Sequence, residues 1–132
     1  MPVWVQTGYD EYAKRLPKNF QLSLVEVARR AEAERILGRV GPTDTLVVLD
    51  ETGTGLSTVK FAGKLKTWQE AGANPTFVVG GADGLDPSCL ERANFRLSLS
   101  SFTLPHGMVR VMLAEQIYRA WSLLNNHPYH RA

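Results

Sequence analysis

The sequence predicts an α/β domain with a largely parallel sheet and flanking helices. Short apolar runs that suit buried strands alternate along the chain with longer segments that suit amphipathic helices. Loops rich in glycine or in small and polar residues follow three of these runs. The chain has 132 residues, of which 44% are hydrophobic, so it is long and apolar enough to bury a core. We therefore expect one domain over residues 1–132.

A helix, a strand and a second helix are predicted for the first forty residues. Apolar side chains recur at helical spacing in the first segment, at Val5, Tyr9, Tyr12 and Leu16. Pro17 ends this helix. Residues 20–27 are largely apolar and partly alternate with polar residues, which is typical of a strand. Residues 28–40 are rich in helix formers and predict a second helix, which ends at Gly41 and the proline after it.

The middle of the chain is predicted to hold a buried strand, a loop and a helix. The apolar run at 45–49 suits a parallel strand, and residues 50–55 after it suit a loop. Ser57 can cap the next helix by accepting a hydrogen bond from its backbone. Three side chains share one face of that helix: Phe61, Leu65 and Trp68. Gly72 fits its C-terminal end.

Two more strands and two more helices are predicted for the C-terminal part. Residues 76–79 suit a buried strand that runs into the loop 80–84. Asp86, which proline follows, is expected to cap a short helix. Residues 95–99 alternate like a strand. After a loop of small residues, a long helix is expected from 108 to about 125.

Three loops are candidates for a shared ligand site. They span residues 50–55, 80–84 and 100–106, and each follows a predicted strand. Parallel sheets bind ligands beyond the C-terminal ends of their strands. If these strands are neighbours in the sheet, the three loops meet at one pocket.

Two of these loops each allow two interpretations. The glycines of GGADG at 80–84 let backbone amides approach a ligand, but an ordinary tight turn has the same composition. Its spacing matches neither a dinucleotide fingerprint nor a Walker phosphate loop. In SLSSFTLPH at 98–106, small side chains expose backbone groups that can bind a flat heterocycle such as adenine. Alternatively, Ser100, Ser101 and Thr103 cap local backbone groups.

Charge and histidine spacing give no independent argument for nucleic acid or metal. The chain carries 15 basic and 13 acidic side chains, a net charge of +2, which is too small to predict RNA binding. Basic side chains gather near the C-terminus, at Arg110, Arg119, His127, His130 and Arg131. On charge alone they form a solvated helix face. No carboxylate or cysteine completes a metal set with the histidines, so we expect no metal site.

Several features predict a cytoplasmic protein. No apolar run is long enough to span a membrane, and the N-terminal residues lack the pattern of a signal peptide. The single cysteine, Cys89, cannot form an internal disulfide. Because it falls within a predicted helix, we expect a packed and inert thiol.

Five segments carry a resemblance to a known family. They are PVWVQTGYDEYAKRLP, VVLDETG, FVVGGADGL, LSLSSFTLPHGMVRVMLAEQIYRAW and the ending NHPYHR. In this order they resemble the RlmH family of ribosomal RNA large subunit (pseudouridine-N3) methyltransferases, which belong to the SPOUT class. The resemblance covers nearly the whole chain. It implies a SPOUT fold with a C-terminal trefoil knot, a homodimer, and S-adenosyl-L-methionine as methyl donor.

The resemblance also implies a cofactor site and a reaction. Eight residues of its motifs are expected to bind the cofactor: Leu49, Gly81, Leu99, Ser100, Ser101, Phe102, Thr103 and Leu104. The implied reaction is methylation at N3 of a pseudouridine in helix 69 of 23S rRNA, on the assembled ribosome. Rival functions are a non-catalytic RNA- or ribosome-binding protein with this fold, and an enzyme that acts on a small nucleotide.

The C-terminal tail supplies most of the candidate substrate contacts. We expect His130, Tyr129 and Arg119 to be catalytic, and His106 and Arg131 to bind substrate. His130 can accept the N3 proton because its ordinary pKa lies near neutrality, and Tyr129 can stack on the base. Alternatively, the tail only positions the base and water takes the proton. We expect the tail to serve the substrate and not the fold.

The sequence departs from the family pattern at its start. The family begins with a short strand ahead of the PVWVQTG segment, and here the chain starts at that segment. The region around 28–38 is also shorter than the family pattern. We expect the missing strand to leave a neighbouring strand with an open edge.

Overall fold

One parallel sheet lies at the centre of the protein. The computed structural model describes residues 2–18, 20, 24–27, 30–41, 43–81 and 84–131. Within these residues the sheet has four strands in the order β1-β3-β2-β4, all parallel: β1 Leu24–Val27, β2 Thr45–Gly55, β3 Pro75–Gly80 and β4 Phe95–Ser98. The prediction of an α/β domain with a parallel sheet and flanking helices is therefore confirmed.

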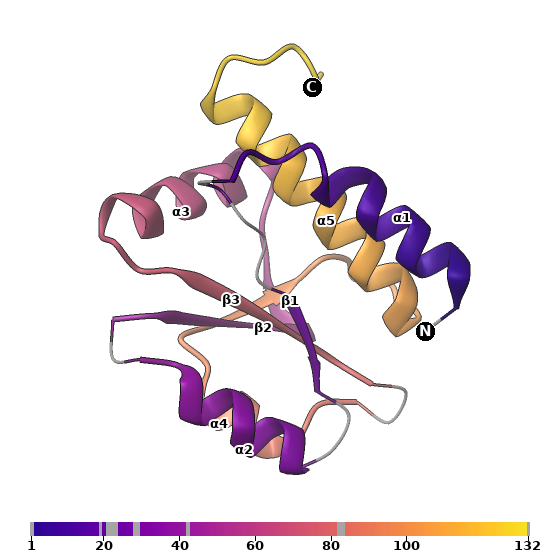
Figure 1. Ribbon diagram of the computed structural model, residues 1–132, viewed down its shortest axis with the longest axis vertical. Coiled ribbons are helices and arrows are strands. Elements are labelled where there is room, and N and C mark those ends of the chain that lie inside the picture. Colours follow the sequence, from indigo (N-terminus) through magenta and orange to yellow (C-terminus); the bar gives the residue numbers. More distant parts are fainter. Residues whose placement is uncertain are drawn as a thin grey trace.

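Helices cover both faces of this sheet (Figure 1). They are α1 Val3–Ala13, α2 Arg30–Arg39, α3 Thr58–Glu70, α4 Pro87–Arg92 and α5 His106–Leu124. Helices α3 and α5 lie on one face, with α1 against α5, and α2 and α4 lie on the other. Within the described residues, no helix is both long and apolar enough to cross a membrane.

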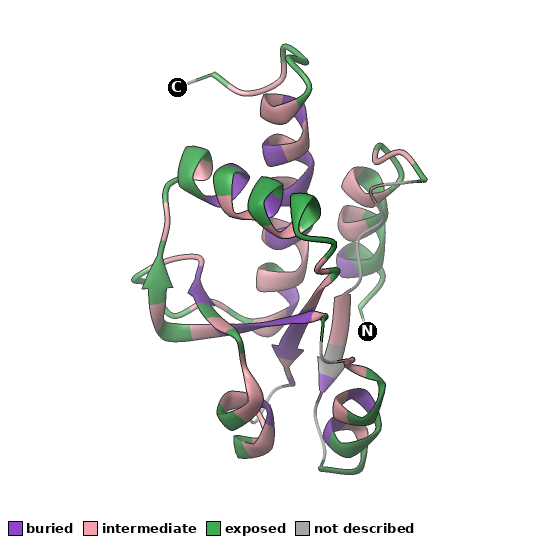
Figure 2. Cartoon of the chain, turned by 90° about the vertical axis from the view of Figure 1, so that its left-hand side faces the viewer, coloured by how far each residue is buried: buried purple, intermediate pink, exposed green. Residues whose placement is uncertain are grey.

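Two hydrophobic cores form because successive side chains of a strand point to opposite faces. The core under α3 and α5 contains Val47, Leu49, Phe77, Val79 and Leu97 from the strands. The core over α2 and α4 contains Leu46, Val48, Val78 and the buried Cys89. Figure 2 shows the buried residues gathered in the strands and on the inner faces of the helices. Burying one leucine or valine side chain completely stabilises the folded state by about 1.5–3 kcal/mol relative to leaving it exposed.

Two glycines let α1 and α5 approach closely. A Cβ added at Gly107 would lie 2.8 Å from Cγ2 of Val5, and one at Gly8 would lie 3.1 Å from Cγ1 of Val111. Larger residues at either position would push the helices apart. Val5 is therefore the buried residue of α1, while Trp4 beside it stays about half exposed.

Local signals for helix ends are confirmed. The Ser57 side chain accepts a hydrogen bond from the backbone N–H of Lys60 at 3.2 Å, at the start of α3. Asp86 accepts one from Ser88 at 2.9 Å, at the start of α4. Gly72 follows α3 with a φ of 69°, a conformation that favours glycine. By contrast, α1 ends at Ala13, before the predicted end at Leu16.

The loop predicted at 50–55 is wrong, because β2 continues to Gly55. Both Leu49 and Thr54 pair with Leu97 of β4, so the residues between them bulge out of the strand. Gly53 permits this bulge, since a Cβ there would lie 2.7 Å from the carbonyl oxygen of Arg96. The chain thus leaves the sheet at Asp50 and returns to it.

Other boundaries shift by a few residues. The strand predicted at 20–27 is β1 from Leu24 in the described residues, and residues 21–23 lie outside them. Residues 28 and 29 of the second predicted helix also lie outside. The long C-terminal helix begins at His106, two residues before its predicted start.

Candidate functional site

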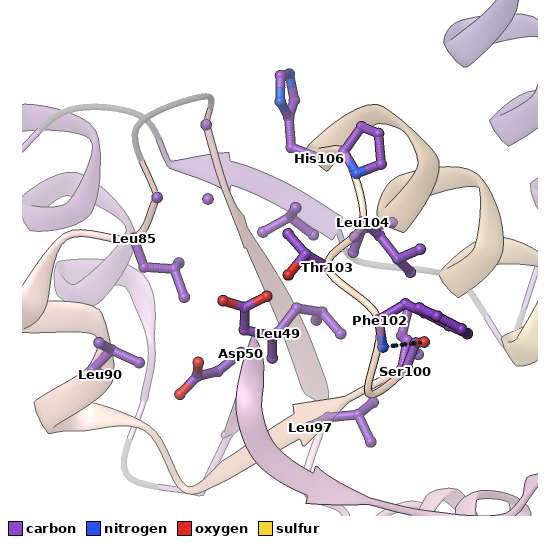
Figure 3. Close-up of a pocket in the computed structure, with 18 residues that line it drawn as sticks. Leu49, Asp50, Leu85, Leu90, Leu97, Ser100, Phe102, Thr103, Leu104 and His106 are labelled. Carbon is purple, nitrogen blue, oxygen red and sulfur yellow. Dashed lines mark hydrogen bonds between the residues drawn. The ribbon is translucent and has the colours of Figure 1, made fainter.

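A cavity of about 520 Å³ lies at the C-terminal ends of β3 and β4 and beside the bulge of β2 (Figure 3). Three segments line it: 49–51 at the bulge of β2, 79–81 and Gly84–Leu85 at and after the end of β3, and 99–106 without Ser101 between β4 and α5. These strands are neighbours in the sheet. Parts of all three predicted loops therefore line one pocket, as expected, but only Asp50 and Glu51 of the range 50–55 do so, and they belong to β2.

The floor of the cavity is apolar. It is formed by Leu49, Val79, Leu85, Leu90, Leu97 and Val109. These side chains come from the strands, from the segment before α4, and from α4 and α5, and they exclude water from one side of any bound ligand. Such a floor suits a flat, weakly polar group such as a heterocycle.

The segment 99–105 lines the cavity, apart from Ser101, and is held by hydroxyl groups. The buried Ser98 donates from Oγ to the carbonyl oxygen of Ser100 at 2.9 Å. Oγ of Ser100 in turn accepts a hydrogen bond from the backbone N–H of Phe102 at 2.9 Å. Local capping and ligand contact are therefore compatible here. Of the residues expected in the cofactor site, Ser101 does not line the cavity, and Phe102 is 80% exposed.

The glycine segment is a tight turn that also lines the cavity. The backbone N–H of Gly84 donates to the carbonyl oxygen of Gly81 at 3.0 Å, and Gly84 has a φ of 91°. A Cβ at Gly80 would lie 2.7 Å from the carbonyl carbon of Gly84. Ala82 and Asp83 lie outside the described residues. The interpretation of this loop as a tight turn is therefore confirmed, and its contact with a ligand stays a prediction.

Charged groups at the cavity are acidic. Asp50 and Glu51 line it, and no described lysine or arginine does. The Asp50 carboxylate accepts hydrogen bonds from the backbone N–H of Thr52 at 3.2 Å and from its hydroxyl at 3.0 and 3.1 Å. In Figure 3, Asp50 lies between Leu85 on one side and Thr103 on the other. This charge favours a ligand with a positive group and disfavours a phosphate.

The C-terminal tail folds back on its own chain, so the expectation that it plays no part in the fold is wrong. The ring of Tyr129 packs edge-on against Tyr118 with centroids 4.7 Å apart. The guanidinium of Arg119 lies 4.8 Å from the centroid of the Tyr129 ring. Burial raises the pKa of the Tyr129 phenol above its usual range. Aromatic and cation–π contacts thus dock the tail.

Hydrogen bonds connect the tail to α5. Nε of Arg119 donates to Oε1 of Glu115 at 2.8 Å, and Nη1 of Arg119 lies 3.2 Å from Nδ1 of His130. From α1, Arg15 lies 5.3 Å from the ring centroid of Tyr118. We call this group the tail cluster: Tyr12, Arg15, Glu115, Tyr118, Arg119, Tyr129 and His130.

The tail cluster lies far from the cavity along α5. His106 lines the cavity at the start of the helix, and Arg119 comes thirteen residues later. At 1.5 Å per residue they are about 20 Å apart along the axis. In Figure 1 the tail lies at the opposite end of α5 from the helix start. Within one chain, the structure brings the cofactor candidates together but leaves the tail candidates elsewhere, with Arg131 exposed.

Sequence reasoning gave no site role to Asp50 and Glu51 at the cavity, or to four members of the tail cluster: Tyr12, Arg15, Glu115 and Tyr118. Asp50 and Glu51 follow a predicted strand directly, and their position at its end was the available signal. Tyr12 and Glu115 belong to predicted helices, so their positions in the sequence were accounted for by the helix pattern and gave no indication of a site. Within the described residues, no group of three histidine, cysteine or acidic side chains could hold a metal.

A family model described as "Predicted SPOUT methyltransferase" matches residues 1–130. The chain is 52% identical to "Ribosomal RNA large subunit methyltransferase H" of Hydrogenovibrio crunogenus, over 99% of this chain and 92% of that protein. It is 49% identical to the protein of the same name from Cupriavidus pinatubonensis, over 100% of this chain and 93% of that protein. It is also 49% identical to the protein of the same name from Nitrosococcus oceani, over 100% of this chain and 92% of that protein.

Solved structures include at least one with a similar fold. It is described as the structure of a probable methylase family protein from Haemophilus influenzae Rd KW20. The TM-score is 0.57 at 12% identity, over 97% of this chain and 66% of that chain. At this identity the likeness concerns the arrangement of helices and strands only.

Proposed function

The chain belongs to the SPOUT methyltransferase family, and on that premise we propose that it methylates ribosomal RNA of the large subunit. The substrate in this proposal is N3 of a pseudouridine in helix 69 of 23S rRNA, on the assembled ribosome. Ribosomes are cytoplasmic particles, so we expect the protein to work in the cytoplasm.

S-adenosyl-L-methionine is the proposed methyl donor, and the cavity at the strand ends is its proposed site. The cavity is the observation that carries the proposal. Its volume of about 520 Å³ falls within the usual range for small-molecule sites. An apolar floor fits adenine, and the backbone groups of the lining segment 99–105 are the proposed partners of its polar edge. The Asp50 and Glu51 carboxylates fit a ligand with a sulfonium and an ammonium group.

The residues of the chain have separate tasks in this proposal. The segment Leu99–Leu104 binds the adenosine part through its backbone, and Gly81 lets the turn after β3 come close. The bound donor supplies an electrophilic methyl group. The leucines keep water from that group, and the enzyme contributes mainly orientation and desolvation. His106, at the start of α5, faces the incoming base.

The tail cluster is the proposed RNA contact. Tyr129 offers a ring for stacking, and Arg119 and the exposed Arg131 offer guanidinium groups for the RNA. His130 is the side chain of this cluster that we expect to lie beside N3, where the substrate loses a proton. It either accepts the N3 proton or leaves that proton to water.

A homodimer follows from the separation of these two regions. The donor cavity and the tail cluster lie about 20 Å apart along α5, which is too far for direct methyl transfer within one chain. A second copy can bring its tail to the cavity of the first. Apolar side chains are exposed near the cavity end of α5, at Val3, Trp4, Phe102 and Met108. Burying them against a second copy would stabilise the pair.

Mass spectrometry of ribosomal RNA tests the proposal. Ribosomes from a strain that lacks the modification are incubated with the protein and S-adenosylmethionine. We expect about one methyl group per ribosome, at N3 of one pseudouridine. Binding to ribosomes without methyl transfer would instead identify a non-catalytic protein with this fold. Methyl transfer to free nucleotides but not to ribosomes would identify an enzyme that acts on small nucleotides.

A further inference from the structure

We propose that Glu115 and Arg119 are positioning residues that hold His130 as a neutral imidazole with its proton on Nε2. In this form His130 donates a hydrogen bond to the substrate base and does not accept the N3 proton. The role given to the base rests on the proposed function. The state of the imidazole rests on the tail cluster alone.

The contact between Arg119 and His130 fixes the tautomer. Nη1 of Arg119 lies 3.2 Å from Nδ1 of His130. A guanidinium has five N–H donors and no acceptor, so Nδ1 must accept in this contact. A neutral imidazole has one donor and one acceptor nitrogen, and its proton is therefore on Nε2. A protonated ring would instead direct an N–H at the guanidinium and add a second positive charge.

Glu115 holds the guanidinium in place. Its two carboxylate oxygens lie 2.8 and 3.3 Å from Nε of Arg119, one helical turn away on α5. The Glu115 side chain is 16% exposed and that of Arg119 is 25% exposed, so solvent weakens this pair less than a surface pair. The hydrogen bond to Glu115 raises the pKa of Arg119. Arg119 therefore stays a charged donor.

The surroundings of His130 contain few other charged groups. Arg119 and Glu115 face it from α5, while Tyr129 and Arg131 flank it in the tail. From α1, Arg15 lies over the Tyr12 and Tyr118 rings, and its own carboxylate partner is Glu11. No described carboxylate forms an ion pair with His130 to favour its protonated form.

An Nε2–H donor fits the chemistry at N3 of a uracil-type base. When N3–H gives its proton to water, N3 keeps the electron pair and negative charge spreads to the neighbouring carbonyl oxygens. N3 then forms the new N–C bond, while the C–S bond of the donor breaks and leaves its electrons on sulfur. A donor aimed at a carbonyl oxygen stabilises this developing charge.

Nitrogen NMR of the imidazoles tests the tautomer directly. The full chain is labelled with ¹⁵N in histidine, and His130 is assigned from the signal lost in His130→Ala. We expect Nδ1 unprotonated and Nε2 protonated near neutral pH, with His106 and His127 as internal references. In Arg119→Ala this preference should be lost. An Nδ1–H tautomer, or a protonated ring at neutral pH, in the wild-type protein would overturn the proposal.

Substitution of His130 tests the catalytic role. The side-chain amide of glutamine places an N–H near the position of Nε2 but cannot accept the proton. We expect His130→Gln to keep methyl transfer within about tenfold of wild type, whereas His130→Ala loses about 10²–10³-fold, the usual effect of removing such a donor. The rise of the rate with pH, which reports loss of the N3 proton, should persist in His130→Gln. Equal losses in both variants, with no remaining pH dependence, would show that His130 is the base.

Glu115 provides the test of positioning. Glu115→Gln keeps an oxygen acceptor for Arg119, and Glu115→Ala removes it. We expect the imidazole tautomer and the methylation rate to survive in Glu115→Gln and to be impaired in Glu115→Ala. An unchanged tautomer in Glu115→Ala would exclude Glu115 from this role. Failure of the wild-type protein to methylate ribosomes would overturn the proposed function, and the NMR result would still decide the tautomer.

Discussion

At Asp50, a carboxylate faces the cavity that we assign to a positively charged donor. Asp50→Asn should weaken binding of S-adenosylmethionine, because the donor carries a sulfonium charge. Two unit charges about 8 Å apart interact by about 2 kcal/mol at an effective dielectric constant near 20, so a loss of up to about thirtyfold is expected. Isothermal titration calorimetry measures the change in Kd.

The demethylated product is the control for this prediction, since S-adenosylhomocysteine lacks the sulfonium charge. Its Kd should change much less in Asp50→Asn than that of the donor. Glu51→Gln is the matched variant, and its exposed side chain should have a smaller effect. Equal weakening of donor and product would mean that Asp50 shapes the cavity without sensing charge.

Gly81 is the residue where backbone approach matters most for the donor. It is buried, pairs with Gly84 across the tight turn, and lines the cavity. Gly81→Val should abolish measurable binding of S-adenosylmethionine, because the branched side chain occupies cavity space. Circular dichroism should show the fold retained. The same change at Gly63, where an added Cβ meets nothing within 4 Å, should leave binding intact. Unchanged affinity in Gly81→Val would rule out Gly81 as a contact.

Individual site residues were predictable where a motif and a strand end coincided. Leu49 ends one apolar run and Gly81 comes shortly after another, and the resemblance pointed to the same positions. Asp50 was assigned to a loop without a role, because its orientation depends on the hydrogen bonds with Thr52. The contact between Arg119 and His130 joins residues eleven positions apart, and no helical spacing predicts it.

Among the elements, α1 and α5 are the pair whose packing depends most on small residues. Gly107→Ala places a methyl group 2.8 Å from Cγ2 of Val5. We expect a loss of about 1–3 kcal/mol in the free energy of unfolding, measured by urea denaturation. Gly63→Ala in α3 is the matched control, and helix propensity alone should make it neutral or stabilising by up to about 1 kcal/mol. Val5→Ala should restore part of the loss when combined with Gly107→Ala.

That test distinguishes close packing from a loose contact. If Gly107→Ala and Gly63→Ala change stability equally, then α1 can move away from α5 at no measurable cost. The glycine at 107 would then have no packing role.

Element types were predictable, and the extent of β2 was not. The apolar run 45–49 has strand composition, but residues 50–55 have the composition of a loop. They belong to the strand because Thr54 and Gly55 pair with Leu97 and Ser98 of β4. This pairing is more than forty residues distant in sequence, and a local pattern carries no information about it.

At the scale of the whole molecule, the proposed homodimer predicts complementation between inactive variants. Gly81→Val should abolish donor binding in the cavity, and His130→Ala removes the imidazole of the tail. If each site combines the cavity of one copy with the tail of its partner, a mixed dimer has one intact site. After exchange of equal amounts, about half of the dimers are mixed, so about one quarter of wild-type activity is expected.

The outcome depends on subunit exchange, which sedimentation of differently tagged copies can verify. No recovery of methyl transfer in verified mixed dimers would contradict a site shared between copies. A single 14.7 kDa species at micromolar concentration would contradict the dimer itself.

Long-range arrangement was the least predictable property. The strand order β1-β3-β2-β4 differs from the order along the chain, and alternation of strands and helices does not specify it. The docking of the tail was not predictable, because Arg119 was expected to act on the substrate and Tyr118 falls within the long helix, so neither residue indicated a contact with the tail. The trefoil knot and the open strand edge, both taken from the family pattern, stay predictions.

Because α5 is a continuous helix of nineteen residues, insertions and deletions within it should have larger effects than those in the surface turns of this chain. One residue added to an α-helix rotates everything after it by about 100° and lengthens it by 1.5 Å. An alanine inserted after Leu113 would therefore turn Arg119 and the tail to another side of the helix, and would also turn the core residues Ile117 and Ala120 away from the sheet. Such a variant should lose stability as well as RNA methylation. An alanine added to the surface turn at Gly72–Ala73 should be tolerated, so natural length variation is expected in such turns and not in α5.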